Sequence, residues 1–284
     1  MKNRRIFLFG SIFLGFIFFL SVIITLFQKQ IPIGSKVALV RVEGPIFESK
    51  TAVNELKGYL KDKSIKAIVL RVDSPGGGVV AAQEIYAEVL RASAEKKIVV
   101  SMGALAASGG YYISAPATKI IANPGTITGS IGVIMEVPNI KGLMDKIGIK
   151  SEVIKSGRNK DLASVFRGIG TEERAILQGV MDDVHEQFIK AVADGRKMPV
   201  SKVKDFADGR VFSGKQALKL GLVDELGDLE AAIKSAALLA GIQGEPEVVS
   251  KKEKTVLHDL LNGSIMEILW KRMPATELKY LYRF

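Results

Sequence analysis

The chain has no cysteine, and only two of its 284 residues are histidine. Without cysteine it has no disulfide bond, no thiolate metal site, no iron–sulfur cluster and no thiol nucleophile. A chain without thiols suits either redox compartment, so this absence does not locate the protein. The two histidines, His185 and His258, are the only side chains that a histidine-dependent mechanism can use.

The net charge of +10 is not gathered into one basic stripe. Residues 1–5 and residues 251–284 each carry a net charge of +3, which leaves +4 for the remaining body. The sequence has no basic patch with interleaved aromatic residues, the pattern that binds single strands, so we expect no nucleic acid partner. With 48% apolar and 25% charged residues, the composition is that of a globular protein and excludes a disordered or collagen-like chain.

One long uncharged run lies near the N-terminus. The 22 residues at 6–27 carry no charge, and at about 1.5 Å per residue they span a hydrocarbon core of roughly 30 Å. Basic residues precede the run, which predicts a cytoplasmic N-terminus and a body outside the membrane. A cleaved signal peptide is the alternative, but its apolar run is usually about 7–15 residues long and ends in a small-residue cleavage site. We therefore expect an uncleaved, single-pass anchor in the cell membrane.

Predicted strands and helices alternate along the body. Apolar runs bounded by turn residues predict strands at 37–42, 67–72, 98–102, 119–122 and 151–155. Helical spacing predicts helices at 51–61, 79–94, 108–115, 140–147, 172–195, 201–206, 215–220 and 229–240. A loop rich in glycine, threonine and serine is expected at 124–132. This alternation with short links predicts an α/β fold with parallel strand pairing.

A glycine-rich turn, DSPGGG at 73–78, follows one predicted strand and precedes a predicted helix. Its three glycines let backbone N–H groups face a ligand without side chains in the way, and the helix N-terminus adds positive potential. Such a turn is typical of an oxyanion hole. It is not a phosphate loop, because it has neither the GxxxxGK[ST] spacing nor a following lysine. A plain strand-to-helix turn is the alternative.

A serine followed by two glycines is the candidate nucleophile. Small residues at 103–107 lead into Ser108-Gly109-Gly110 and a predicted short helix. A nucleophilic serine needs a sharp turn that exposes Oγ, and a following backbone N–H that can bind an oxyanion. The segment is similar to a nucleophile elbow, although Ala106 stands where GxSxG has its first glycine. A close-packed helix crossing is the alternative.

The general base is expected to be a lysine. His185 falls inside a predicted helix between acidic residues and His258 falls in the basic tail, so we interpret both as surface histidines rather than as members of a Ser-His-Asp triad. Lys160 lies in a polar, glycine-containing loop after a predicted strand, whereas Lys119 begins a strand. The sequence thus favours a Ser–Lys dyad with Lys160 as the base.

A neutral lysine amine needs a hydrogen-bond partner that adds no negative charge. The hydroxyl of Ser130 or of Thr128, in the loop at 124–132, can serve. Ser201 and Lys204 match the SxxK spacing, but we interpret this serine as a helix N-cap. The sequence gives no metal or cofactor motif, so we expect neither group.

Taken together, the motifs resemble one family. In chain order, SPGGG, AASGGYYIS, TGSIGV, SGRNKD and ADGRVFSGKQALKLGLVDELG are similar to segments of signal peptide peptidase A, the protease IV family of membrane serine peptidases. The resemblance implies that Ser108 is the nucleophile, that Lys160 is its general base and that Ser130 orients the lysine amine. It also implies an oxyanion hole formed by the backbone N–H groups of Gly77 and Gly109.

The same resemblance implies a fold, an organisation and an activity. The fold is a crotonase- and Clp-peptidase-like spiral of ββα units behind an N-terminal transmembrane helix. The order is a basic cytoplasmic segment at 1–5, an anchor at 6–27, a linker at 28–36, a peptidase domain at 37–250 and a basic amphipathic tail at 251–284. The enzyme degrades cleaved signal peptides and similar short hydrophobic peptides on the outer, periplasmic or extracytoplasmic side. Larger members have two tandem halves; this chain matches one, which implies a homo-oligomeric ring or dome.

Three other functions stay open at the level of sequence. A peptidase of the same superfamily can cleave a dedicated membrane partner, such as a stomatin-like protein, with the same chemistry. A hydratase of the crotonase fold needs acidic groups near the glycine turn and has no use for an anchor. A non-enzymatic scaffold has no need of the Ser108 and Lys160 pair.

Overall fold

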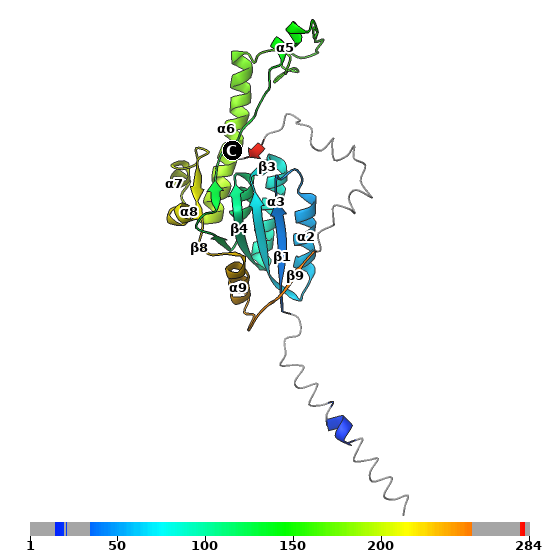
Figure 1. Ribbon diagram of the computed structural model, residues 1–284, viewed down its shortest axis with the longest axis vertical. Helices are drawn as coiled ribbons and strands as arrows, with labels where there is room; N and C mark the ends of the chain where they lie inside the picture. The colour runs from blue at the N-terminus through cyan, green and yellow to red at the C-terminus, as the bar shows by residue number, and fades with distance from the viewer. Residues whose placement is uncertain (1–14, 20, 22–34, 252–278, 282–284) are drawn as a thin grey trace, which may run out of the picture.

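The computed structural model describes residues 15–19, 21, 35–251 and 279–281 (Figure 1). Most of the expected anchor at 6–27, and most of the tail at 251–284, therefore lies outside the described residues. Within the described ranges, no helix combines the length and the apolar character needed to span a bilayer.

A mixed eight-stranded sheet forms the centre of the described body. Its main path is β7-β6-β4-β2-β1-β9, and β5 pairs with both β4 and β8. Every pairing in this sheet is parallel except that of β6 with β7. The strands are β1 (Lys36–Glu43), β2 (Ile65–Ser74), β4 (Lys97–Ala107), β5 (Lys119–Ala122), β6 (Ile127–Gly129), β7 (Val211–Ser213), β8 (Glu225–Leu226) and β9 (Glu247–Ser250). A separate antiparallel pair joins β3 (Gly76–Gly78) to β10 (Lys279–Leu281).

Helices cover both faces of the sheet (Figure 1). Alternate residues of β1 explain how: Ala38 and Val40 pack in one core cluster, whereas Val37 and Leu39 pack in a second cluster on the other face. Both sets are buried, as expected for strands inside a parallel sheet. The first cluster includes α2 (Lys50–Lys61), α3 (Val79–Glu95), α4 (Gly109–Ser114) and the C-terminal half of α6 (Thr171–Arg196), and the second includes α9 (Leu229–Leu239). Three short helices complete the described set: α5 (Lys141–Lys146), α7 (Val200–Lys204) and α8 (Gly214–Leu220).

The predicted α/β class and the parallel pairing are confirmed, but the strands differ in part from expectation. The short strands β3, β7, β8, β9 and β10 were not predicted. The loop predicted at 124–132 contains β6, and the strand predicted at 151–155 does not form. β6 is only three residues long, and its central residue is polar, so its sequence lacks the usual apolar pattern. That residue, Thr128, is buried because its hydroxyl donates a 2.6 Å hydrogen bond to the Ala106 carbonyl. Residues 151–155 lie outside the sheet, and no described strand pairs with them. An apolar run alone does not make a strand.

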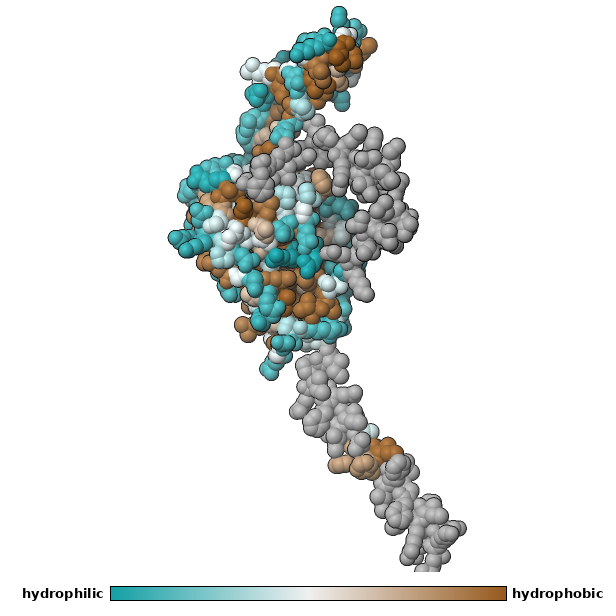
Figure 2. All heavy atoms as spheres, in the orientation of Figure 1, coloured by the Kyte–Doolittle hydropathy of each residue, from teal (hydrophilic) through white to brown (hydrophobic). Residues whose placement is uncertain are grey.

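Residues 133–170 form an arm that projects from the body together with the first half of α6 (Figure 1). Figure 2 shows apolar side chains gathered over this arm. The exposed apolar residues of the arm are Leu143, Ile147, Ile149, Val153, Ile154 and Phe166. An exposed apolar patch of this kind marks an interaction surface.

The packing of α2 on the sheet gives a stability prediction. Leu56 is fully buried in the core, so Leu56→Ala is expected to lower the free energy of unfolding by about 2–5 kcal/mol. Leu238 is 79% exposed, and Leu238→Ala is the matched control, expected to change that free energy by less than about 0.5 kcal/mol. Chemical denaturation of both variants measures the difference; equal losses would contradict the assignment of Leu56 to the core.

Candidate active site

Ser108 sits on a sharp turn between β4 and α4. Its backbone has φ 53° and ψ −119°, a conformation that costs energy for a residue with a Cβ. Two hydrogen bonds of 2.8 Å hold the turn: Ser108 N–H donates to the Gly129 carbonyl, and Tyr112 N–H donates to the Ser108 carbonyl. This strand–serine–helix turn is the geometry that the sequence pattern predicted for a nucleophile elbow. Among the described residues, the Ser108 hydroxyl has no hydrogen-bond partner.

The glycine-rich turn packs directly against the elbow. A Cβ on Gly110, at the start of α4, would lie 2.7 Å from the Ser74 carbonyl oxygen. A Cβ on Gly77 would lie 2.1 Å from the Ile46 carbonyl oxygen. Only glycine permits such approaches of one backbone to another. These glycines therefore let the first turn of α4 pack on Ser74, within the glycine-rich turn, and let β3 pack on Ile46.

The backbone N–H groups of Gly77 and Gly109, the expected oxyanion donors, lie on β3 and at the start of α4. Ile46 exchanges hydrogen bonds of 2.8 Å with Gly76 and Gly78, so these groups occupy one edge of β3. Neighbouring residues of a strand point their N–H groups to opposite edges, and the Gly77 N–H therefore faces the other edge. The Gly109 N–H is at the first turn of α4, where helix N–H groups have no partner within the helix. The structure thus brings Gly77 and Gly109 to the neighbourhood of Ser108.

Ser130 is also near the elbow. It follows β6, which pairs with β4 so that Gly129 lies opposite Ala107. Ser130 has φ 50°, and its N–H donates a 2.8 Å hydrogen bond to the Arg210 carbonyl. The loop before β7 therefore fixes the backbone of Ser130 in a conformation that few residues with a Cβ adopt. Its side chain is buried.

Lys160 is the one predicted site residue that the fold does not bring to the elbow. It lies in the projecting arm and is exposed (Figure 1). None of the hydrogen bonds or ion pairs in the described part of the chain joins it to Ser108 or Ser130. By contrast, Lys119 is at the start of β5 and forms a 2.6 Å ion pair with Glu225. A single copy of the chain therefore brings Ser108, Gly77 and Gly109 together without Lys160.

A compact ion-pair cluster shapes the loop that carries Lys160. The Asp161 carboxylate accepts hydrogen bonds from Arg167 Nε, at 2.9 Å, and from Lys155. Arg167 also pairs with Glu173 on α6. Hydrogen bonds from Arg167 and then Lys155 hold the pKa of Asp161 below its ordinary value. The Asp161 carboxylate therefore binds two cations other than the neighbouring Lys160.

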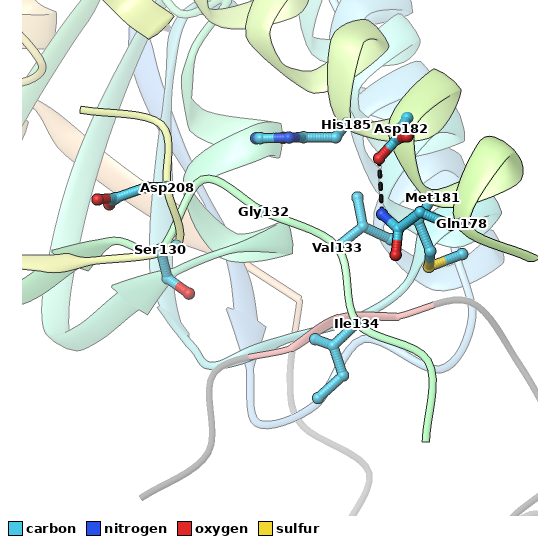
Figure 3. Close-up of a pocket in the computed structure, with 10 residues that line it drawn as sticks. Ser130, Gly132, Val133, Ile134, Gln178, Met181, Asp182, His185 and Asp208 are labelled. Carbon is cyan, nitrogen blue, oxygen red and sulfur yellow. Dashed lines mark hydrogen bonds between the residues drawn. The ribbon is translucent and has the colours of Figure 1, made fainter. Parts of the chain in front are cut away.

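A pocket of about 430 Å³ adjoins Ser130 (Figure 3). His185 from α6 and Asp208 from the loop before β7 also line it. The His185 Nε2 is buried and has no hydrogen-bond partner among the described residues, so the prediction of a satisfied surface histidine is wrong. Gln178, Met181 and Asp182 line the same pocket; their spacing on α6 could have signalled one helix face at the site. His258 lies outside the described residues.

The C-terminal strand β10 lies along β3. Tyr280 is opposite Gly77, between Lys279 opposite Gly78 and Leu281 opposite Gly76. β10 also contacts α3 and α4. An extended segment of this chain therefore runs along the edge of β3 to which the Gly77 N–H points.

The described residues contain no group of three or more acidic or histidine side chains that could hold a metal ion.

Comparisons with known proteins agree with this geometry. The chain matches the model of peptidase family S49 over residues 91–243 and that of Clp protease over residues 40–128. A Synechocystis sp. protein named as a protease is 48% identical over 208 residues, 73% of this chain and 75% of that protein. An Enterococcus faecium protein named as a signal peptide peptidase is 39% identical over 81% of this chain and 67% of its own length. The chloroplastic serine protease SPPA of Arabidopsis thaliana is 33% identical over 78% of this chain and 34% of its own length.

The strand–serine–helix turn and the largely parallel sheet behind it define a serine hydrolase with a Clp protease-like α/β fold. The chain belongs to peptidase family S49 and is a serine endopeptidase. A peptidase function excludes the scaffold and the hydratase among the alternatives that the sequence left open.

The ion-pair cluster beside Lys160 gives a pH prediction. Hydrogen bonds from Arg167 and from the Gly170 N–H lower the pKa of Glu173 from its ordinary 4.5 to about 2. Because the folded-state pKa is depressed, the stabilisation is present above pH 4.5 and is lost as the pH falls toward 2. Glu173→Gln is therefore expected to lower the melting temperature at pH 6, with a gap that closes on acidification.

Glu172→Gln is the matched control for that prediction. Glu172 also pairs with an arginine, Arg158, but both side chains are more than half exposed, and such a pair contributes little. We expect the Glu172→Gln melting temperature to follow the wild type at every pH. A Glu173→Gln gap of constant size between pH 6 and pH 2 would contradict the assigned pairing.

Proposed function

We propose that this chain is a membrane-anchored endopeptidase that uses a Ser108–Lys160 dyad to degrade cleaved signal peptides and similar short hydrophobic peptides. The observation that carries the proposal is the strained Ser108 turn beside the glycine-rich β3. The name of the Enterococcus faecium relative supports the substrate class. The match to Clp protease supports the finer fold, a crotonase- and Clp-peptidase-like spiral of ββα units.

The proposed reaction begins at the Ser108 hydroxyl. Ser108 Oγ attacks the scissile carbonyl carbon while the neutral Lys160 amine takes the hydroxyl proton. The Gly77 and Gly109 N–H groups bind the oxygen that becomes negative. The lysine then gives its proton to the leaving amine as the peptide bond breaks. In the second stage the lysine takes a proton from water, which attacks the acyl carbon. The ester bond to Ser108 Oγ breaks, and the lysine returns the proton to that oxygen. Ser130 holds the lysine amine without adding charge.

The lysine comes from a neighbouring copy in this proposal. Lys160 is exposed in the arm, away from the elbow of its own chain (Figure 1). The apolar side chains beside it on the arm are exposed, and packing on a second copy would bury them. A head-to-tail contact of this kind repeats around a ring. The homo-oligomeric ring or dome implied by the sequence would therefore complete every active site.

The anchor at 6–27 fixes the location in this proposal. Its uncharged length and its preceding basic residues place the N-terminus in the cytoplasm. The body then lies on the periplasmic or extracytoplasmic side of the cell membrane, where released signal peptides are found. The alternative, cleavage of a dedicated membrane partner, uses the same residues. A cleavage profile on a peptide library separates the two, because a dedicated enzyme would cut one sequence strongly and the others weakly.

A mixing experiment tests the shared dyad. Ser108→Ala and Lys160→Arg are each expected to lose activity by about 10³-fold or more, since one lacks the nucleophile and the other keeps a permanently charged base. Co-assembly of equal amounts should restore up to about a quarter of wild-type activity, because random neighbours combine an intact serine with an intact lysine at one site in four. Peptide hydrolysis before and after refolding the mixture measures this.

Lys119→Arg is the control, because its ion pair with Glu225 tolerates either cation. It should retain wild-type activity and should assemble normally by light scattering. Absence of restored activity in verified mixed oligomers would show that both residues act within one chain. Full activity of Lys160→Arg would refute the dyad itself.

A second prediction concerns the edge of β3. If peptide substrates pair with this edge, β10 occupies their place, and deletion of residues 279–284 is expected to lower KM severalfold. Tyr280→Pro should act in the same direction, since proline has no N–H to donate. Deletion of residues 282–284 alone keeps β10 and is the control. An unchanged KM in both test variants would place the substrate elsewhere.

A further inference from the structure

The register between β2 and β4 changes just before the elbow. From Ala67 to Val72 the two strands pair residue by residue, with Val72 opposite Met102. The next pair is Ser74 opposite Ala106. One residue of β2, Asp73, therefore faces three residues of β4 at 103–105. This is a β-bulge, and bulges redirect the strand that follows them.

The side chain of Asp73 fills this bulge. Its Oδ1 accepts a 3.0 Å hydrogen bond from the Leu105 N–H. A Cβ on Gly103 would lie 2.5 Å from the Asp73 Cγ and 2.6 Å from its Oδ2. The carboxylate thus occupies the space that a side chain at position 103 would need. It binds a backbone donor that faces β2 where the regular ladder is interrupted.

Two buried hydroxyls hold the same segment from the other side. Thr126 Oγ1 donates a 2.7 Å hydrogen bond to the Gly103 carbonyl. Thr128 Oγ1 donates a 2.6 Å hydrogen bond to the Ala106 carbonyl. Both threonines are buried, whereas Asp73 is half-buried. The bulge is therefore fixed by a carboxylate from β2 and by hydroxyls on and beside β6, and Ser108 follows only three residues after Leu105.

We propose that Asp73 is a positioning residue for the nucleophile: its carboxylate sets the bulge of β4 and, through it, the direction of the Ser108 turn. The inference rests on the proposed role of Ser108. Asp73 needs only an oxygen acceptor of the right length for this task, because its partner is one backbone N–H. A displacement of about 1 Å at a reacting group costs on the order of 100-fold in rate. A small relaxation of the bulge would therefore slow catalysis strongly.

The test compares Asp73→Ala with Asp73→Asn in the full chain. Asp73→Ala is expected to lower kcat, and the rate of Ser108 labelling by a fluorophosphonate, by about 10-fold to 100-fold with KM within about twofold. Asp73→Asn keeps an oxygen that accepts the Leu105 N–H and should stay within about threefold of wild type. Rescue by the amide separates positioning from any need for the negative charge.

A second pair of variants keeps the proposal falsifiable if Asp73→Ala folds poorly. Gly103→Ala adds a methyl group where the carboxylate lies, so it should slow labelling by about as much as Asp73→Ala. The Asp73 Cβ would also lie 2.8 Å from that methyl group, so the double variant combines Gly103→Ala with Asp73→Gly, which removes both the Cβ and the carboxylate. This double variant should be no slower than Asp73→Gly alone, whereas independent sites would multiply their losses.

Asp62→Ala is the matched control. Asp62 likewise accepts a backbone hydrogen bond, from Ser64 N–H at 2.8 Å, but at the opposite end of β2. It should leave kcat and labelling unchanged. Unchanged labelling of Asp73→Ala, or losses that multiply in the double variant, would overturn the inference. A wild-type enzyme that the probe labels at a residue other than Ser108 would instead overturn the proposed function.

Discussion

The close approach of three backbone segments is the constraint on which the site depends. Gly77 lies against the Ile46 carbonyl, Gly110 lies against the Ser74 carbonyl, and Ser108 N–H binds the Gly129 carbonyl. All three contacts join segments that are far apart in the chain, and the two glycine contacts leave no room for a side chain. Their combined geometry holds Ser108 at a positive φ, which costs energy wherever the surrounding structure does not enforce it. The parallel sheet supplies that enforcement, because β2, β4 and β6 all deliver their C-terminal ends to one edge.

This constraint explains which parts of the site were visible in the sequence. Glycines that must accept a neighbouring backbone leave a local mark, and SPGGG and ASGG were therefore predicted to hold the oxyanion donors and the nucleophile. Strands β1, β2 and β4 were also predicted, since buried parallel strands are continuous apolar runs. β6 was missed because Thr128 in the strand, and Thr126 just before it, donate hydrogen bonds from their hydroxyls to carbonyls of β4. The bulge opposite Asp73 could not be predicted from the sequence. The register of β4 depends on how it pairs with β2, and the sequence of one strand does not determine that pairing.

The arm and the body are held in place by different interactions. Its exposed Ile147, Ile154 and Phe166 have no core to enter within the described chain, and the segment predicted as a strand at 151–155 has no neighbour to pair with. What orders the arm locally is charge: Arg167 binds both Asp161 and Glu173. The apolar residues at 151–155 led to the prediction of a strand. Their pattern does not contain the information that these residues stay exposed on the described chain.

A consequence for control of the activity follows from this division. The body holds Ser108 in a strained, buried turn, and its hydroxyl has no hydrogen-bond partner among the described residues. A serine hydroxyl without a base is a poor nucleophile near neutral pH. If Gly77 and Gly109 bind the oxyanion and the base arrives on the arm of a neighbouring copy, an isolated chain is inert although both glycines already lie near Ser108. Assembly would then switch on proteolysis without rearranging the body, and the energy stored in the Ser108 turn would be used only in the oligomer.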